Sequence, residues 1–322
     1  MIPRMSKRTL ALLGMIVCVA LWSLAPIAGK YLFDEGAYSP ALLIGIRGAV
    51  AVLVLGLFLL LTKRFSRITR AYWVCLPAGL ILGLAYLLQF IGLSTTPLSK
   101  NTFLESFSVL AVPLCMFLFV REKPTVASLF AAVFCFFGCF VLCGKGMDFS
   151  AFFQPPTLGE VFSALGGAFF GANIAFTKVF AKKLDPFIYV FFQMIVMTAM
   201  SFLYAIPFEA DLAFSFAWNH VLVALFLALF CTVGCWLLRT VCIRHVSALT
   251  TVVLNPMSAV LATVLSVLLG MEEFSWNVVI GGAIITLSIL VSGILDARAE
   301  AAKKQTKTPE EKPPLPEGDG RQ

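Results

Sequence analysis

The sequence has few charged residues for its length. Asp, Glu, Lys and Arg make up 13% of the 322 residues, whereas a soluble domain carries roughly 25%. The charges are also unevenly placed, since 12 of the 41 lie between Asp296 and Gln322. A water-soluble fold could not cover its surface with the charges that remain. The composition therefore excludes an ordinary cytosolic enzyme and indicates an integral, multi-pass helical membrane protein.

The sequence also lacks the motifs of common catalytic and cofactor sites. We find no G-x-S-x-G nucleophile motif, no phosphate-binding loop and no pair of catalytic carboxylates. The two histidines and nine cysteines do not combine at the spacing of metal ligands. The net charge of +7 does not indicate nucleic-acid binding, because the basic residues lie in short loops between apolar runs. We expect a protein that is not an enzyme and has no cofactor, whose partners are the lipid bilayer, a small-molecule substrate and, as one option, a second copy in a homodimer.

Long apolar stretches are abundant instead. A helix of about 20 apolar residues spans the ~30 Å hydrocarbon core of a bilayer. The alternation of a β-barrel is absent, because runs such as 50–61 are apolar on every face. The predicted fold is an all-α integral membrane protein with ten transmembrane helices. Their expected ranges are 10–32, 39–62, 72–93, 99–120, 125–143, 158–180, 187–207, 218–241, 247–270 and 276–295.

The positions of Lys and Arg predict how the helices are oriented. Basic residues concentrate on the cytoplasmic side of membrane proteins. The loops and helix ends on the side of the N-terminus carry 14 basic residues, whereas those on the other side carry only Lys30, Lys100 and Lys145. Both termini are therefore predicted to be cytoplasmic, and a bacterial plasma (inner) membrane is the expected location. The 14 basic residues are Arg4, Lys7, Arg8, Lys63, Arg64, Arg67, Arg70, Arg121, Lys123, Lys178, Lys182, Lys183, Arg239 and Arg244.

The two halves of the chain resemble each other. Residues 91–110 align without gaps with residues 241–260, at an offset of 150. Each half has five predicted helices, an odd number, so the second half enters the membrane in the opposite sense. Such inverted repeats are typical of transporters, with a substrate site near the midplane. The predicted domains are a first five-helix repeat over 1–146, a second, inverted repeat over 147–296, and a disordered cytoplasmic tail over 297–322.

Several of these residues resemble a known family. Leu21-Trp22-Ser23 followed by Gly29-Lys30 is similar to the first-helix pattern of EamA-like members of the drug/metabolite transporter superfamily. Pro40 followed by Arg47 is similar to the second-helix pattern of that family, and the second repeat has Pro186 and Gln193 at this spacing. Glu122 and Glu272 lie where the family has a Gly-Glu-x-x-Thr signature, although Arg121 replaces the glycine of the first copy. The resemblance implies two five-helix repeats and transport of amino acids, other metabolites, drugs, or nucleotide-linked or lipid-linked compounds.

Polar residues inside the predicted helices are the candidates for substrate contact. An ionisable side chain inside a bilayer costs about 2.5–3.5 kcal/mol on insertion scales, so Glu105 is the sharpest candidate. It would either bind a substrate amine or carry a proton. Its neighbours on the same helix face, Asn101 and Ser108, either line a cavity or hold helices together by hydrogen bonds. The repeat places Thr251, Asn255 and Ser258 at the corresponding points of the ninth helix.

Aromatic and polar residues that are three positions apart in both halves suit the wall of the same cavity.

Lys100, at the outer mouth of the fourth helix, either holds a substrate carboxylate or reaches to the interface. Arg47 is expected to have a structural partner, and Lys178 to anchor its helix at the interface. The remaining candidates are Tyr86 and Gln89 on the third helix, their repeat counterparts Trp236 and Arg239 on the eighth, and Trp22 on the first.

These features predict a secondary transporter that exports a small polar metabolite such as an amino acid. The substrate would move by alternating access around a central cavity between the two repeats. One alternative is a carrier or flippase for lipid-linked, nucleotide-linked or cationic drug-like compounds, which is favoured if Glu105 is the main substrate contact. A second alternative is a membrane subunit that does not transport.

Overall fold

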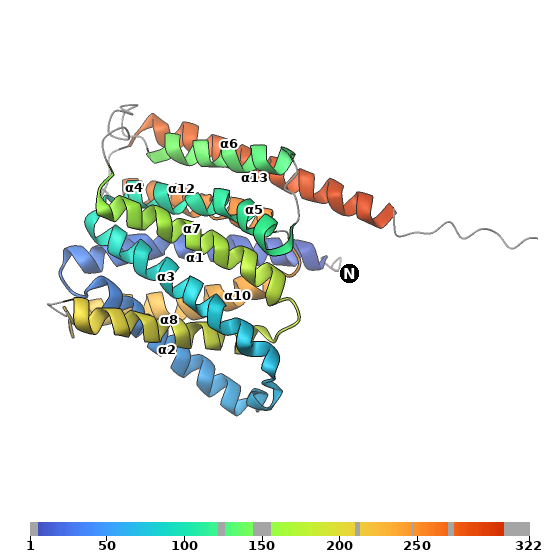
Figure 1. Ribbon diagram of the computed structural model, residues 1–322. Helices are drawn as coiled ribbons and strands as arrows, with labels where there is room; N and C mark the ends of the chain where they lie inside the picture. Colours follow the sequence, from blue (N-terminus) through green and yellow to red (C-terminus); the bar gives the residue numbers. More distant parts are fainter. Residues whose placement is uncertain are drawn as a thin grey trace, which may run out of the picture.

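The computed structural model describes residues 6–121, 126–143, 156–209, 213–246, 248–269 and 274–305. Within these ranges the regular structure is helical, apart from one isolated β-bridge between Tyr38 and Phe214. Glu122, Lys145 and Glu272 lie outside the described residues. Figure 1 shows the helices as a bundle whose long axes run in roughly one direction.

The first half contains α1 (Lys7–Asp34), α2 (Pro40–Leu61), the short 3-10 helices η1 (Arg64–Arg67) and η2 (Arg70–Val74), α3 (Cys75–Thr95), α4 (Leu98–Glu105), α5 (Phe107–Val120) and α6 (Val126–Cys143). The second half contains α7 (Leu158–Phe180), α8 (Pro186–Phe208), α9 (Trp218–Phe226), the π-helix η5 (Leu227–Gly234), α10 (Cys235–Cys242), α11 (Ala248–Leu254), α12 (Pro256–Leu268) and α13 (Trp276–Gln305).

Local sequence signals explain several helix starts. Proline is the first residue of both α2 and α8, a position where the missing N–H costs nothing. Thr157 and Glu160 form a capping box at the start of α7, in which each side chain accepts a hydrogen bond from the backbone N–H of the other residue. Ser6 caps α1 by accepting from the backbone N–H of Thr9, 3.1 Å away.

Helices occupy all ten predicted ranges, and four of these ranges are split: η2 with α3, α4 with α5, α9 with η5 and α10, and α11 with α12. Seven helical segments in the described part of the chain are long and apolar enough to cross a membrane, so the protein is an integral, multi-pass membrane protein. Three shorter apolar helices, over 129–142, 256–265 and 276–288, lie in the other predicted ranges. The number of ten crossings stays a prediction.

The last helix is longer than the sequence analysis assumed. α13 continues to Gln305, so residues 297–305, which had been assigned to the tail, are helical. Their sequence is rich in Ala, Glu and Lys, which are strong helix formers. Residues 306–322 lie outside the described part of the chain.

The helices of the two halves pack against one another as counterparts. α6 packs against α13 at one edge of the bundle, and α2 packs against α8 toward the opposite edge (Figure 1). Between these pairs, α7 packs against α3 and α5, and α1 packs against α10 and α12. The largest apolar core draws residues from both halves, such as Leu43, Ile44, Tyr189 and Met194. The two halves therefore share one core.

Small residues allow the halves to approach closely. A Cβ atom added at Gly167 of α7 would lie 2.5 Å from the carbonyl oxygen of Glu105, and one added at Gly171 would lie 2.6 Å from that of Ser108. Side chains at these positions would push α7 away from α4 and α5. Backbone contact of this kind is typical of helix packing in membranes. It holds the residues of α4 and α5 in place against the second half.

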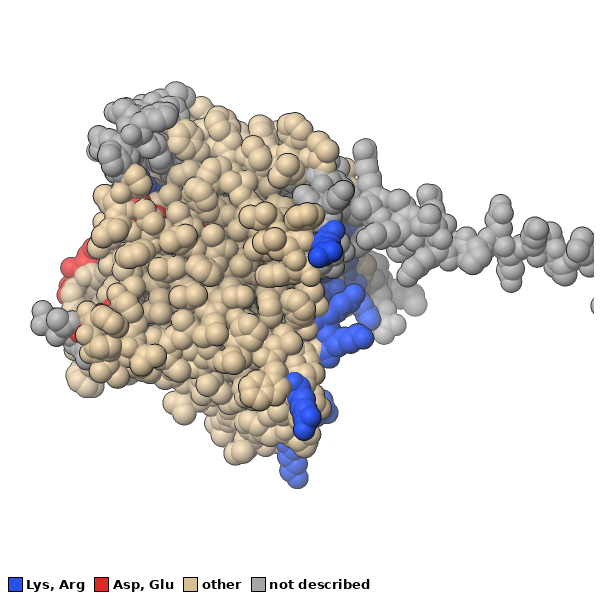
Figure 2. All heavy atoms as spheres, in the orientation of Figure 1, with Lys and Arg blue, Asp and Glu red and all other residues tan. Residues whose placement is uncertain are grey.

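Charged residues gather on two opposite faces of the molecule. Figure 2 shows Lys and Arg on the face that also carries the start of α1 and the end of α13, and Asp and Glu on the opposite face. We call these the basic face and the acidic face. The separation agrees with the predicted distribution of basic residues. Basic residues at the start of α1 and in or beside the α2–α3, α7–α8 and α10–α11 connections are Lys7, Lys63, Arg64, Arg67, Arg70, Lys182, Lys183 and Arg244.

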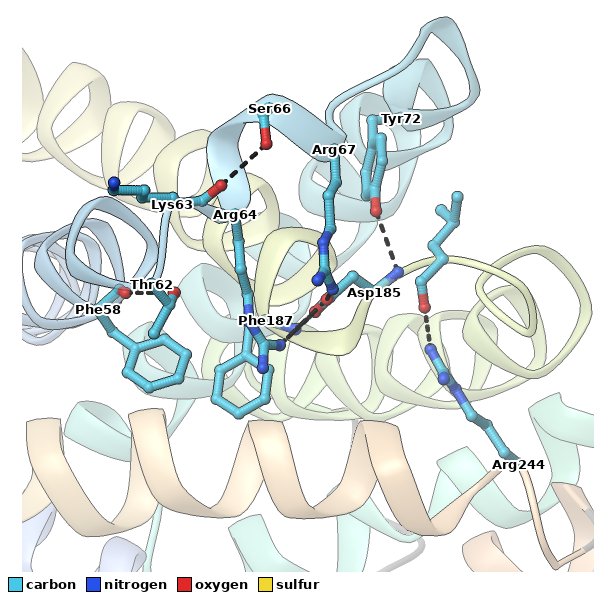
Figure 3. A network of polar contacts seen from close by, with 11 residues as sticks. Phe58, Thr62, Lys63, Arg64, Ser66, Arg67, Tyr72, Asp185, Phe187 and Arg244 are labelled. Atoms are coloured by element: carbon cyan, nitrogen blue, oxygen red, sulfur yellow. Dashed lines mark hydrogen bonds and ion pairs between the residues drawn. The ribbon is translucent and has the colours of Figure 1, made fainter.

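A network around Asp185 joins the two halves on the basic face (Figure 3). The Asp185 carboxylate accepts hydrogen bonds from Arg64 Nη1 at 3.1 Å and from the backbone N–H of Phe187 at 2.9 Å, and it also lies 3.8 Å from Arg67 Nη1. The Asp185 backbone N–H donates to the Tyr72 hydroxyl at 3.0 Å. Asp185 thus caps α8 and holds the α2–α3 connection of the first half against the second.

Two more cations on this face bind backbone carbonyls. Arg244 Nη2 donates to the carbonyl oxygens of Ala181 and Leu184. Burial lowers the pKa of the Arg244 guanidinium, and the negative charge of Asp185 opposes that shift. Lys178 Nζ donates to the carbonyls of Ile243, at 2.6 Å, and Val246. The prediction that Lys178 anchors its helix at the interface was therefore incomplete, because its ammonium group also binds α7 to the segment that follows α10.

Replacing Asp185 by Ala is expected to destabilise the protein by about 1–3 kcal/mol, because α8 loses its cap and Arg64 loses a partly buried partner. Asp185→Asn keeps an oxygen that can cap α8, so it should lower the free energy of unfolding by about half as much. Thermal unfolding in detergent measures both variants. Asp34→Ala is the control, since Asp34 pairs with Lys30 on an exposed helix surface, where an ion pair contributes little. Equal melting temperatures for Asp185→Ala and Asp34→Ala would contradict this assignment.

Candidate functional site

A cavity lies between the two halves, near the middle of the bundle. Its empty volume is about 860 Å³, part of which is open to solvent. It is lined by Trp22, Ala25 and Pro26 of α1; Arg47 of α2; Tyr86, Gln89 and Phe90 of α3; Thr102, Glu105, Ser106 and Ser108 of α4 and α5; Phe170 of α7; Trp236 and Arg239 of α10; and Asn255, Pro256, Ser258 and Ala259 at the α11–α12 junction.

One helix in each half is interrupted where it lines the cavity. The break between α4 and α5 falls at Ser106, and the break between α11 and α12 falls at Asn255. Pro256 has no N–H to continue the helix, and the Ser106 hydroxyl donates to the carbonyl of Phe103 at 2.5 Å. The repeat offset of 150 residues relates the two breaks to within one residue. Interrupted helices inside a membrane occur where their free backbone groups line a cavity.

An aromatic pair marks the point where the two halves meet. The Trp236 Nε1–H donates to the Tyr86 hydroxyl at 2.6 Å, and these residues are separated by 150 positions, the offset of the repeat. The ring centroids of Tyr86 and Trp236 are 5.9 Å apart, and Trp22 lies 5.9 Å from Trp236 on the other side. The Trp22 Nε1–H donates to the carbonyl of Cys231 at 2.9 Å. Repeat-equivalent side chains thus form one wall of the cavity.

Glu105 ends α4 at the first helix break and lines the cavity. Its Oε2 atom accepts a hydrogen bond from Gln89 Nε2 at 2.7 Å. Among the described residues, no Lys, Arg or His nitrogen is recorded within 4.0 Å of this carboxylate. A carboxyl group held by an amide, with no cation beside it, can accept a substrate amine or a proton.

Arg47 and Arg239 are the other charged residues among those that line the cavity, and each is 2% exposed. Arg47 Nε donates to the Thr232 hydroxyl at 3.2 Å, and its guanidinium lies over the rings of Tyr86 and Phe90. Arg239 Nη2 donates to Asn173 Oδ1 at 2.9 Å, and its guanidinium lies 4.1 Å from the Trp236 ring centroid. Arg47 Nη1 and Arg239 Nε have no hydrogen-bond partner among the described residues. Within the same residues, neither arginine forms an ion pair with a carboxylate.

The structure brings together nine of the twelve predicted site residues. Those that line the cavity are Trp22, Tyr86, Gln89, Glu105, Ser108, Trp236, Arg239, Asn255 and Ser258.

Three predicted residues point elsewhere. Asn101 donates to the Ser163 hydroxyl at 2.8 Å, so its role is the helix–helix contact that was the alternative prediction. Lys100 pairs with Glu160 at 2.5 Å, because the side of α4 opposite the cavity faces α7. Thr251 is fully buried and does not line the cavity. Lys100 and Thr251 do not line this cavity, because helical periodicity does not fix which face of a buried helix meets a neighbouring helix.

Sequence reasoning missed one cation of the cavity. Arg47 was assigned a structural partner only, yet it is buried at the cavity together with Arg239, which was predicted there. The partner of Arg47 lies in the π-helix η5, where the Thr232 hydroxyl donates to the carbonyl of Leu227 five residues earlier. Hydropathy does not reveal such a bulge, although π-helices are frequent at functional sites. The other lining residues that were missed are Ala25, Pro26, Phe90, Thr102, Ser106, Phe170, Pro256 and Ala259.

Comparison with known proteins agrees with this geometry. The model of the EamA-like transporter family matches residues 9–144 and, a second time, residues 157–294. A protein of known crystal structure superposes with a TM-score of 0.71 over 89% of this chain and 99% of its own, at 20% sequence identity. That likeness shows the fold alone. No curated protein matches the sequence.

Proposed function

The chain belongs to the EamA-like transporter family, and from this premise we propose that it is a secondary transporter that exports a small polar metabolite, such as an amino acid, by alternating access. Membership of the family and the apolar helices make it a multi-pass membrane transporter. The observation that carries the finer proposal is the cavity, because the charged side chains of Glu105, Arg47 and Arg239 line it inside the helix bundle. Intramembrane charges mark substrate and ion pathways.

The chemistry of the cavity suits an amino-acid head group. The Glu105 carboxylate can accept hydrogen bonds from a substrate amine, while Arg47 and Arg239 offer donors to a carboxylate. The residues at the two helix breaks, Ser106 and Asn255, line the same cavity as Tyr86 and Trp236. In transporters built from inverted repeats, such breaks hold substrate near the midplane of the membrane.

Contacts toward the basic face support a cavity that is closed on that side in this conformation. Lys178 binds the carbonyls of Ile243 and Val246 there, and Asp185 joins the two halves. Alternating access requires these contacts to separate while others form at the acidic face. The basic face supports cytoplasmic termini and a bacterial inner-membrane location. An apolar cluster on the same side consists of Ala11, Met15, Val19, Cys242, Val246 and Leu254.

Uptake of radiolabelled amino acids into proteoliposomes tests the proposal. We expect saturable uptake of at least one amino acid by vesicles that contain the protein, and none by empty vesicles. Efflux from preloaded vesicles of both orientations tests the direction. Absence of uptake across acidic, neutral and basic amino acids, with no ligand-induced thermal stabilisation, would contradict it.

A further inference from the structure

The charges of the cavity are unequal. Among the described residues that line it, Arg47 and Arg239 are cations and Glu105 is the anion. Arginine remains charged in proteins. The cavity therefore carries a net positive charge of one if Glu105 is ionised and of two if it is protonated. In either state the substrate must supply negative charge to balance it.

Among the described residues, neither guanidinium forms an ion pair with a carboxylate. Arg47 uses Nε for a neutral hydroxyl of Thr232, and Arg239 uses Nη2 for the neutral amide of Asn173. One nitrogen of each is buried and has no hydrogen-bond partner among the described residues. A buried cation without a counter-ion is strongly unfavourable, and a guanidinium presents donors in a fork that matches carboxylate or phosphate.

We propose that the transported molecule is a small organic anion whose carboxylate or phosphate group binds to Arg47 and Arg239. The inference rests on the proposed transport function and narrows its substrate class. An amine on the same molecule would bind Glu105, so an acidic amino acid meets all three charges. A neutral amino acid would leave the cavity with uncompensated positive charge, and a cation would increase it.

The second half of the chain supplies a matched substitution. Pro40 and Pro186 are the first residues of α2 and α8, and Arg47 and Gln193 each follow seven positions later. Gln193 is fully buried, so a glutamine fits at this position of the helix. Arg47→Gln therefore removes the charge while it places in α2 the residue that α8 already holds. Arg47→Lys keeps the charge and loses the fork.

The experiment compares the uptake of five labelled probes by proteoliposomes: L-glutamate, succinate, glycerol 3-phosphate, L-leucine and L-lysine. We expect one of the three anions to be taken up at least about tenfold faster than leucine and lysine. Arg47→Gln should reduce the ratio of anion to leucine uptake by about 10- to 150-fold, the range for loss of a charge-assisted hydrogen bond. Arg47→Lys should reduce the ratio of anion to leucine uptake less than Arg47→Gln does. Arg70→Gln, which removes an exposed arginine, should leave the ratio unchanged.

The outcomes separate this inference from the transport proposal. Preference for glutamate or succinate identifies the anionic group as a carboxylate, and preference for glycerol 3-phosphate identifies it as a phosphate. Faster uptake of leucine or lysine, or a ratio that is the same in Arg47→Gln and the wild type, overturns the inference and leaves transport standing. Uptake of none of the five, with no thermal stabilisation by any of them, overturns both.

Discussion

Replacing Glu105 by Gln is expected to reduce transport by about 10- to 150-fold, because the substrate amine loses a charge-assisted hydrogen bond. Glutamine has the shape of glutamate and can still accept from Gln89, 2.7 Å away in the native protein. Folding should therefore be nearly unaffected. Initial uptake rates in proteoliposomes measure the loss, and thermal unfolding in detergent checks that the variant is folded.

The pH profile of the same variant separates the two roles of Glu105. If Glu105 carries the coupling proton, transport driven by a pH gradient disappears in Glu105→Gln, whereas counterflow of substrate persists. If it only binds the amine, both fall together. A pH dependence that is the same in Glu105→Gln and the wild type would contradict the proton-carrier role. The matched control is Glu160→Gln, since Glu160 pairs with Lys100 and does not line the cavity.

Filling the cavity is expected to abolish transport. Ala25 lines the cavity on α1, next to Pro26 and close to Trp22, so the indole of Ala25→Trp would occupy the space of the substrate. Overpacking a filled core costs about 1–3 kcal/mol of stability. Because the new side chain would enter the empty cavity, the variant should avoid most of this cost. Uptake should fall to the level of empty vesicles.

Ala20→Trp provides the control for bulk on the same helix. Ala20 is exposed on the surface of α1, where a tryptophan would face lipid. This variant should transport as the wild type does. Equal loss in both variants would show that α1 tolerates no bulk anywhere, and normal transport by Ala25→Trp would place the pathway outside the cavity.

The repeat made much of the cavity predictable from sequence. An offset of 150 residues paired Tyr86 with Trp236 and Gln89 with Arg239, and the structure places all four at one cavity, with the first two in direct contact. Glu105 was recognisable because a carboxylate within an apolar membrane helix is energetically costly and therefore indicates a function. These predictions rest on residue type and on the alignment of the two repeats, and both can be read directly from the sequence.

Other features depend on packing that the sequence does not encode locally. Asn101 shares a helix face with Glu105, yet the close approach of α7 and its Ser163 hydroxyl takes Asn101 out of the cavity. The π-helix that presents Thr232 to Arg47 arises in an ordinary apolar run. Residues 297–305 were expected to be disordered from their polarity, although their helix propensity continues α13.

The accessibility of a thiol in the cavity from each side of the membrane tests the central claim most directly. Ser258 lines the cavity on α12 and is partly exposed, so Ser258→Cys places a thiol there with little change in shape. Of the nine native cysteines, burial is described for eight: seven are buried and Cys115 is partly buried. The labelling of the wild type gives the background from the native cysteines. Alternating access predicts that a membrane-impermeant maleimide labels Cys at this position in both right-side-out and inside-out vesicles, and that transported substrate slows both reactions. Labelling from one side only, unaffected by substrate, would contradict the account.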